Sequence, residues 1–212
     1  FVVQLLARVR MPKLQSLTLI RASINEELSK TLAALEGVTL DLNLCSAYER
    51  PAEFAPLAPP VRLQRLYLQY PVKAKHVAEL CRFTQLQSLG FDIDSDSESD
   101  EELDEDVSLE ATLRPLCNLK HLHSLQFKGL LGANTLRTLP PTLTSLSVLA
   151  TSLLSDVFEE LKQPDCLPAL SVFEIDTDGG STALPALDSA LAARPNLTVR
   201  PWDRLDPDDV WS

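Results

Sequence analysis

"LQSLTL", residues 14–19, places leucine at its first, fourth and sixth positions, and the chain repeats this arrangement along its length. Valine, phenylalanine or isoleucine takes some of these places in later copies. Repetition at a nearly fixed period predicts stacked units, because one short unit cannot bury its own apolar residues. The further copies are "LEGVTL" (35–40), "LQRLYL" (63–68), "LQSLGF" (86–91), "LHSLQF" (122–127), "LTSLSV" (143–148) and "LSVFEI" (170–175), with an eighth, degenerate copy from Leu197.

The segments between the copies mostly have the spacing of amphipathic helices. Their apolar residues recur three and four positions apart, which predicts one helical face turned toward a core. The segment "TLRTLPPTL" (135–143) differs because Pro140 and Pro141 interrupt it, and we expect it to be extended or a single turn. The predicted helices cover residues 25–35, 73–81, 108–116, 155–162 and 183–193.

The sequence resembles leucine-rich-repeat proteins over nearly its whole length. One L-x-x-L-x-L has little specificity, but eight copies that alternate with helical patterns are a strong signal. Successive copies start 21, 28, 23, 36, 21, 27 and 27 residues apart, and the outlier contains an acidic run. The resemblance implies an α/β solenoid of about eight irregular repeats over residues 1–200, with a concave parallel β-sheet and convex helices or turns.

An asparagine usually follows the last leucine of each repeat in this family and hydrogen-bonds the backbone of the turn. The resemblance gives that role here to Asn43 alone. Such divergence favours the intracellular, helix-backed type, as in F-box-associated or ribonuclease-inhibitor-like proteins, over the extracellular type with regular asparagines and cysteine caps. The other copies have Ala22, Pro71, Asp94, Leu130, Thr151 and Asp178 at the equivalent place.

Both ends of the chain depart from the repeat. We expect Phe1 to lie in the helical half of a repeat that continues an earlier repeat or domain of a longer chain, because "LLARVRMPKL" (5–14) parallels "VAELCRFTQL" (77–86). A stack of repeats needs covered ends. Residues 201–212 contain Trp202 and Trp211, and form either a cap on the last repeat or a tail that binds another subunit.

The motifs argue against catalysis. No nucleotide-binding, serine-hydrolase or zinc-protease motif occurs, and the six glycines are scattered, so we predict neither an enzyme nor a cofactor. His121 and His123 lack further ligands at the spacing of a metal site. The cysteines form no zinc or disulfide pattern, which favours reduced thiols and an intracellular location, cytoplasmic or nuclear. These cysteines are Cys45, Cys81, Cys117 and Cys166, and no apolar run approaches the roughly 20 residues of a membrane span.

The acidity of the chain is local. Residues 92–106 contain ten of the 30 acidic residues, and the remaining 20 are balanced by 19 basic ones. We predict a disordered insertion at 93–106 in the fourth repeat. A charge of −11 that is concentrated in this way disfavours direct binding to nucleic acid and favours a partner protein with a basic surface.

Two other interpretations of the acidic run remain open. A calcium loop of EF-hand type requires glycine where Ser99 stands, which leaves only loose divalent binding. Ser95, Ser97 and Ser99 each have an acidic residue three positions on, the pattern that casein-kinase-II-like enzymes prefer, so they are candidate phosphorylation sites.

The residues between the leucines of each strand should face solvent on the concave side. Most are small and polar, but a few are large, and arginine and tyrosine are enriched at binding hot spots. We predict no small-molecule site. The predicted protein-binding residues are Arg65, Tyr67, Gln69, Gln126 and Lys128.

The sequence therefore favours a non-catalytic recognition module or scaffold that binds another protein. The resemblance suggests the substrate-binding part of an F-box-type ubiquitin ligase receptor, or a subunit of a larger assembly. The alternative is a regulator of an enzyme, such as a GTPase activator.

Overall fold

The computed structural model describes residues 14–22, 26–35, 38–44, 62–72, 74–93, 109–129, 131–150, 155–177 and 184–201. Several predictions concern other parts of the chain. The helical start before residue 14, the acidic insertion with Ser95, Ser97 and Ser99, Cys45, and the cap or tail after residue 201 lie outside the described residues.

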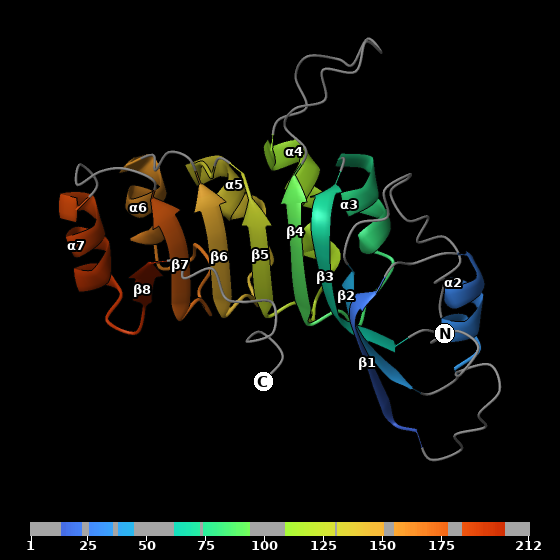
Figure 1. Ribbon diagram of the computed structural model, residues 1–212. Coiled ribbons are helices and arrows are strands. Elements are labelled where there is room, and N and C mark those ends of the chain that lie inside the picture. The colour runs from blue at the N-terminus through green and yellow to red at the C-terminus, as the bar shows by residue number, and fades with distance from the viewer. Residues whose placement is uncertain are drawn as a thin grey trace, which may run out of the picture.

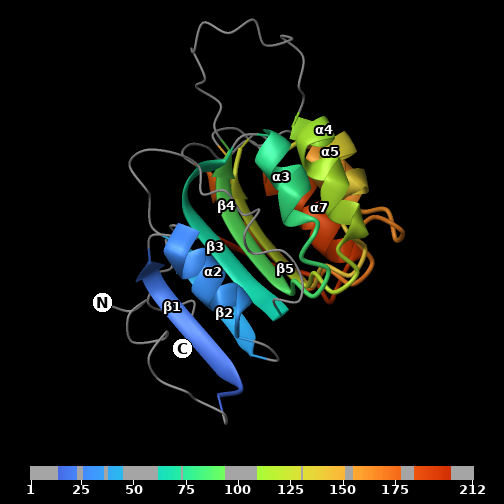
Figure 2. The ribbon, with the colours of Figure 1, turned by 90° about the vertical axis from the view of Figure 1, so that its right-hand side faces the viewer.

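Within these ranges, eight strands form a single sheet in which every neighbouring pair is parallel and the strand order follows the sequence. The helices line one face of this sheet, so the fold is α/β (Figures 1 and 2). The strands are β1 (Ser16–Ala22), β2 (Thr39–Leu44), β3 (Arg62–Val72), β4 (Ser88–Ile93), β5 (Ser124–Lys128), β6 (Ser145–Ala150), β7 (Val172–Thr177) and β8 (Thr198–Pro201). The helices are α2 (Glu26–Ala33), α3 (Ala74–Leu80), α4 (Leu109–Leu113), the 3-10 helix η2 (Arg114–Asn118), α5 (Ala133–Thr138), α6 (Ser155–Leu161) and α7 (Leu184–Ala193).

All five predicted helices are present. In the segment predicted at 108–116, α4 changes to η2 at Arg114, because Pro115 has no N–H to continue the α-helical bonding. Among the described residues, no helix is long and apolar enough to cross a membrane.

The prediction for residues 135–143 was wrong in part, because α5 provides a short helix where an extended segment or single turn was expected. Pro140 and Pro141 follow this helix and do not interrupt it. Leu139 has an extended backbone (φ −75°, ψ 156°), as expected for a residue that precedes proline. The two prolines therefore end the helix without preventing it.

The leucines of the strands form rows that run across the sheet. Leu66, Leu89, Leu125, Leu146 and Phe173 pair one with the next from β3 to β7. Each is at most 1% exposed. Full burial of a side chain of this size contributes about 1.5–3 kcal/mol, so these rows are a main source of stability.

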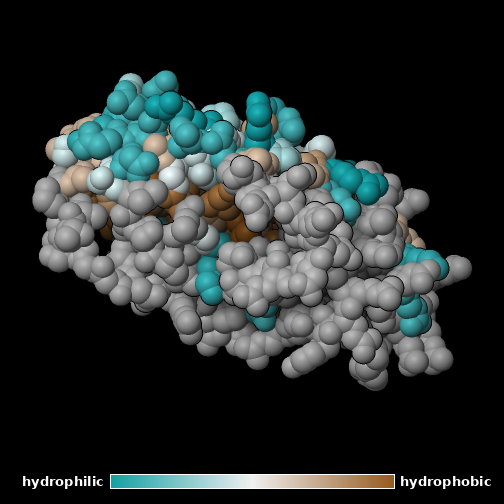
Figure 3. Space-filling view, turned by 90° about the horizontal axis from the view of Figure 1, so that it is seen from above, coloured by the Kyte–Doolittle hydropathy of each residue, from teal (hydrophilic) through white to brown (hydrophobic). Residues whose placement is uncertain are grey.

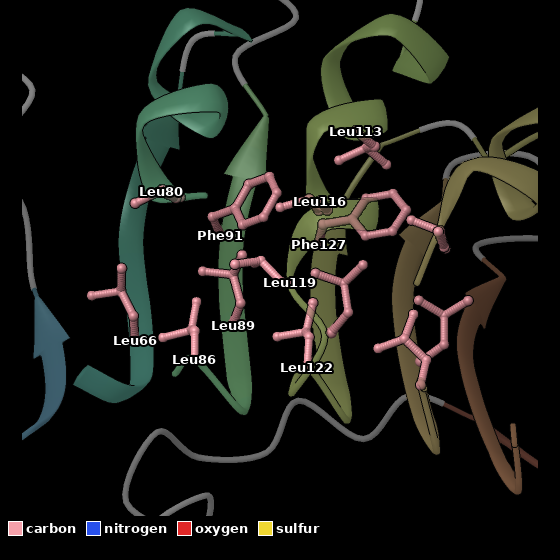
Figure 4. Close-up of a cluster of buried hydrophobic side chains, with 14 of the residues drawn as sticks. Leu66, Leu80, Leu86, Leu89, Phe91, Leu113, Leu116, Leu119, Leu122 and Phe127 are labelled. Carbon is pink, nitrogen blue, oxygen red and sulfur yellow. The ribbon is translucent and has the colours of Figure 1, made fainter. Parts of the chain in front are cut away.

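A second apolar row lies two residues further along the strands. Its Phe91 and Phe127 are stacked, with ring centroids 6.5 Å apart and an interplanar angle of 25°. Leu80, Leu113 and Leu116 approach these rings from the helix side (Figure 4). Seen from above, hydrophilic residues gather over the helix side and hydrophobic ones lie in the hollow beside them (Figure 3). The core therefore lies between the sheet and the helices.

One turn geometry recurs at the entry to most strands. The backbone N–H of Leu86 donates to the C=O of Phe83 at 2.9 Å, three residues earlier. The same bond closes the turns before β5, β6, β7 and β8, with donor–acceptor distances of 2.9–3.2 Å. The donors there are Leu122, Leu143, Leu170 and Leu197, the first leucines of their sequence copies.

The second sequence copy does not follow this register. Leu40, the last leucine of the predicted copy "LEGVTL", pairs with Leu63, the first leucine of the next copy. The ladder shifts directly after it, so that Leu42 pairs with Leu66 and Leu44 with Leu68. After the shift, β2 is displaced by four residues from the predicted register, and because leucine alternates from Leu40 to Leu44, an even displacement still sets leucine opposite leucine.

Arg194 holds together the connection between α6 and β7. Its guanidinium donates to four backbone oxygens, and the shortest bond, 2.7 Å, reaches the C=O of Leu167. Leu167 has a φ of 44°, a left-handed conformation that is unfavourable for leucine. The Arg194 guanidinium therefore satisfies carbonyls in a connection that is otherwise strained. The other three acceptors are the carbonyls of Leu161, Cys166 and Leu170.

We expect Arg194→Ala to lower the free energy of unfolding by about 2–4 kcal/mol, because hydrogen bonds from a charged group are lost and carbonyls are left without donors. Urea unfolding followed by circular dichroism measures the loss. Arg82→Ala is the control because Arg82 is exposed, and it should stay within about 0.5 kcal/mol of the wild type. Equal stability of the two variants would contradict the role of Arg194.

Candidate functional site

The sheet face turned away from the helices carries the side chains between the core leucines, and we call it the polar face. Its central row is formed by strand residues that pair one with the next from β2 to β8. The members of this row are Asn43, Tyr67, Gly90, Gln126, Ser147, Glu174 and Arg200.

All five predicted binding residues lie on strands β3 and β5. Tyr67 and Gln126 belong to the central row, where they are separated by Gly90. Arg65 pairs with Asp41 and Ser88, Lys128 pairs with Asp92, and Gln69 lies at a shift in the β3–β4 ladder. Arg65 and Lys128 are exposed, and the other three are half-buried. The predicted residues therefore share one face but are interleaved with residues of β2 and β4.

The ring of Tyr67 lies across the backbone of β4. A Cβ placed on Gly90 would lie 2.6 Å from Cε2 of Tyr67 and closer still to Cδ2, a separation that side chains do not tolerate. Gly90 therefore provides the space in which the ring rests. The sequence signal for this contact is a glycine inside a strand, which often marks a close approach of another group.

Acidic and basic residues occupy neighbouring strands on the polar face. Burial raises the pKa of Asp41, and the nearby Arg65 acts in the opposite direction. Burial also raises the pKa of Asp92, which Lys128 opposes. Burial, followed by the charge of Asp92, raises the pKa of Tyr67, so its hydroxyl stays protonated at neutral pH. Each of these carboxylates thus has a cation beside it.

Among the described residues, four buried side-chain atoms of β2 and β3 lack a hydrogen-bond partner. They are Oδ1 of Asp41, Oδ1 and Nδ2 of Asn43, and Nε2 of Gln69. Asn43 has no exposed area and lies inside β2, so the expectation that it hydrogen-bonds a turn was wrong. The shifted register of β2 explains this, since it puts Asn43 opposite Tyr67 in the ladder.

The other end of the central row is internally satisfied. The Ser147 hydroxyl donates to Oε2 of Glu174 at 2.7 Å, and Ser147 is 7% exposed. The alternation of residues along each strand predicts both side chains on this face but not the bond between them, because they are 27 positions apart.

Two shallow cavities of about 550 and 470 Å³, both lined by Arg137, lie on the helix side of the described part of the chain. Arg137 binds Glu160 with two bonds, Nε to Oε1 at 2.8 Å and Nη2 to Oε2 at 2.6 Å. The carboxylate side chain is 10% exposed, and the hydrogen bond from Arg137 lowers its pKa. This pair links α5 to α6 and gives a structural role to Arg137 and Glu160, which both line the larger cavity.

The described histidines and cysteines do not form a reactive centre. Nδ1 of His123 lies 3.2 Å from the carbonyl of Thr142, and no group of potential metal ligands occurs in the described part of the chain. Cys81, Cys117 and Cys166 are free thiols. Burial raises the pKa of Cys81 and of Cys166 to about 11, so both are protonated at neutral pH and poor nucleophiles.

No protein-family model matches the sequence, and no curated protein matches it.

We expect Gly90→Ala to destabilise the protein by about 1–3 kcal/mol, because the new methyl group displaces the Tyr67 ring. In a Tyr67→Ala background the same substitution should be neutral or stabilising by up to about 1 kcal/mol, since alanine is less flexible than glycine when unfolded. Denaturant unfolding of the four proteins of this double-mutant cycle measures the coupling. If the effects of Gly90→Ala and Tyr67→Ala on the free energy of unfolding are additive, the contact between the Tyr67 ring and Gly90 is contradicted.

We expect Arg137→Met to be less stable than the wild type at neutral pH, with a difference that shrinks in acid. The folded pKa of Glu160 lies below its ordinary value of 4.5, so the contribution of the pair is present above pH 4.5 and is lost as the pH falls through the folded pKa. Thermal unfolding between about pH 7 and pH 3 tests this. Lys162→Met, which removes the ion pair with the exposed Glu159, is the control. A gap for Arg137→Met that does not change with pH would contradict the assignment.

Proposed function

We propose that this chain is a leucine-rich-repeat solenoid that recognises another protein through the polar face of its sheet. The observation that carries the proposal is the group of large polar side chains on β2 and β3 with buried atoms that lack partners. A face that served only the fold could carry small residues there, as Ser124 and Ser145 do at the positions that continue from Arg65.

The repeat architecture is supported by three observations. The core residues pair in register from β3 to β7, the same turn bond precedes five strands, and each described helix lies on one side of the sheet. Stacked units of this kind offer an extended surface that is suited to a macromolecular partner.

Binding without catalysis is the activity that the described residues favour. The thiols of Cys81 and Cys166 are protonated at neutral pH, and the Arg137–Glu160 pair has a structural role. Free thiols at Cys81, Cys117 and Cys166 fit an intracellular protein, and we propose that compartment. A recognition subunit of a larger assembly, such as a substrate receptor of a ubiquitin ligase, is the form of this function that we favour.

The test compares the partners retained by the wild type and by an Arg65→Ala/Tyr67→Ala/Lys128→Ala variant in a quantitative pull-down. We expect a loss of about tenfold or more of at least one partner, since truncated hot-spot residues each cost over 1 kcal/mol. Thermal unfolding confirms that both proteins are folded.

The matched control removes charged and polar side chains from the helix side, in Glu79→Ala/Arg82→Ala/Lys120→Ala, all of which are exposed. This variant should retain every partner. If the helix-side variant loses the partners and the polar-face variant keeps them, the binding surface has been assigned to the wrong side of the molecule.

A further inference from the structure

One corner of the polar face has more hydrogen-bonding capacity than the chain itself uses. We call it the amide corner, formed by Asp41 and Asn43 of β2 and by Tyr67 and Gln69 of β3. It contains all four buried side-chain atoms that lack a partner among the described residues. They include both polar atoms of Asn43, which is fully buried, and the amide nitrogen of Gln69.

These groups destabilise the isolated protein. A buried polar group without a partner costs about 1–3 kcal/mol, and an apolar side chain of similar shape removes that cost. Asn43 lies between Leu42 and Leu44 and is not one of the alternating leucines of β2, so the packing of the core does not require an asparagine there. A partner that supplies the missing donors and acceptors does account for it.

The chemistry of the corner matches a polypeptide backbone. Each side-chain amide offers a donor and an acceptor, the same groups that every peptide unit of an extended chain presents. Net charge adds little to this recognition, because Asp41 has Arg65 beside it and Asp92 has Lys128 beside it. A highly charged ligand would meet as many like charges as opposite ones.

We propose that the amide corner binds the backbone of an extended, uncharged segment of the partner protein, an inference that rests on the proposed recognition function. The segment crosses the strands along the central row from Asn43 over the Tyr67 ring to Gln126. These residues span three strand intervals of about 4.8 Å, a distance that four to five extended residues cover.

The order of contact follows from burial. Asp41, Tyr67, Gln69 and Gln126 are half-buried and meet the segment first. Asn43 is fully buried, so the segment reaches its amide last, after the groups that cover it have moved, and rearrangement of side chains is common at interfaces. The Tyr67 ring, resting on the bare backbone of Gly90, gives the segment a flat apolar surface beside the amides.

The probe is a phage-displayed library of random peptides about ten residues long, selected on the wild-type protein and depleted on an Asn43→Leu/Gln69→Leu variant. Enriched peptides are synthesised and their dissociation constants measured by fluorescence anisotropy. We expect the peptides to bind at least about tenfold more weakly to the variant. They should bind Gln163→Leu, which changes an exposed glutamine on the helix side, as tightly as the wild type.

Both substitutions at the amide corner remove unpaired groups, so the melting temperature of the variant should be no lower than that of the wild type. Gln69→Leu alone repeats the comparison if the double variant does not fold.

Peptides with single N-methylated amides test the backbone contact directly. At least one such peptide should bind about tenfold more weakly than its parent, while affinity should change little between low and high salt. Failure to enrich any peptide, equal affinity of every N-methylated peptide, or strongly salt-dependent binding of charged peptides would each overturn the proposal. If the triple polar-face variant still loses its partners in that case, the recognition function stands and only the backbone-binding mode fails.

Discussion

The burial of each strand's leucines against those of the next strand is the constraint on which the rest of the molecule depends. Leu66, Leu89, Leu125 and Leu146 occupy one row because a parallel ladder sets them side by side. The helices complete this burial from one side only, so the residues of the central row, such as Tyr67 and Gln126, lie on the other side. The two faces of the sheet therefore differ: one holds the apolar core, and the other is the surface that we propose for recognition.

The two faces of the sheet differ in how far their polar groups are paired within the chain. Among the described residues of the helix side, buried polar groups are paired within the chain: the Arg194 guanidinium donates to four carbonyls, and Arg137 forms two hydrogen bonds with Glu160. On the polar face, the bond between Ser147 and Glu174 is of this kind, whereas Asn43 and Gln69 have unpaired atoms. Unmatched groups therefore gather near β2 and β3, toward the β1 end of the sheet (Figure 1).

Most of the fold was predictable because it depends on local spacing. Leucines spaced three and then two residues apart predicted the strands, and apolar residues spaced three and four apart predicted the helices. Both spacings involve residues that are close in the sequence. The register of β2 was not predictable, since Leu40, Leu42 and Leu44 alternate and fit either of two pairings. The helix α5 was missed because two prolines end a helix as readily as they prevent one.

The candidate site was predictable only as a face. The alternation of strand residues put Arg65, Tyr67 and Lys128 on one side of the sheet, which needs no knowledge of contacts. The contact of the Tyr67 ring with Gly90 and the lack of a hydrogen-bond partner for the Asn43 amide depend on residues more than 20 positions apart. No periodicity in the sequence reports such contacts.

The connection after β4 has a consequence for variation and engineering. It runs from Ile93 to Leu109, yet β4 and β5 pair residue for residue from Ser88–Ser124 to Asp92–Lys128 without a shift. The ladder thus keeps its register across this long connection, and each doubling of the length of a connection costs only about 0.6 kcal/mol in chain entropy. Foreign sequence, such as an affinity tag or a fluorescent sensor, could be placed there while every leucine row keeps its neighbours.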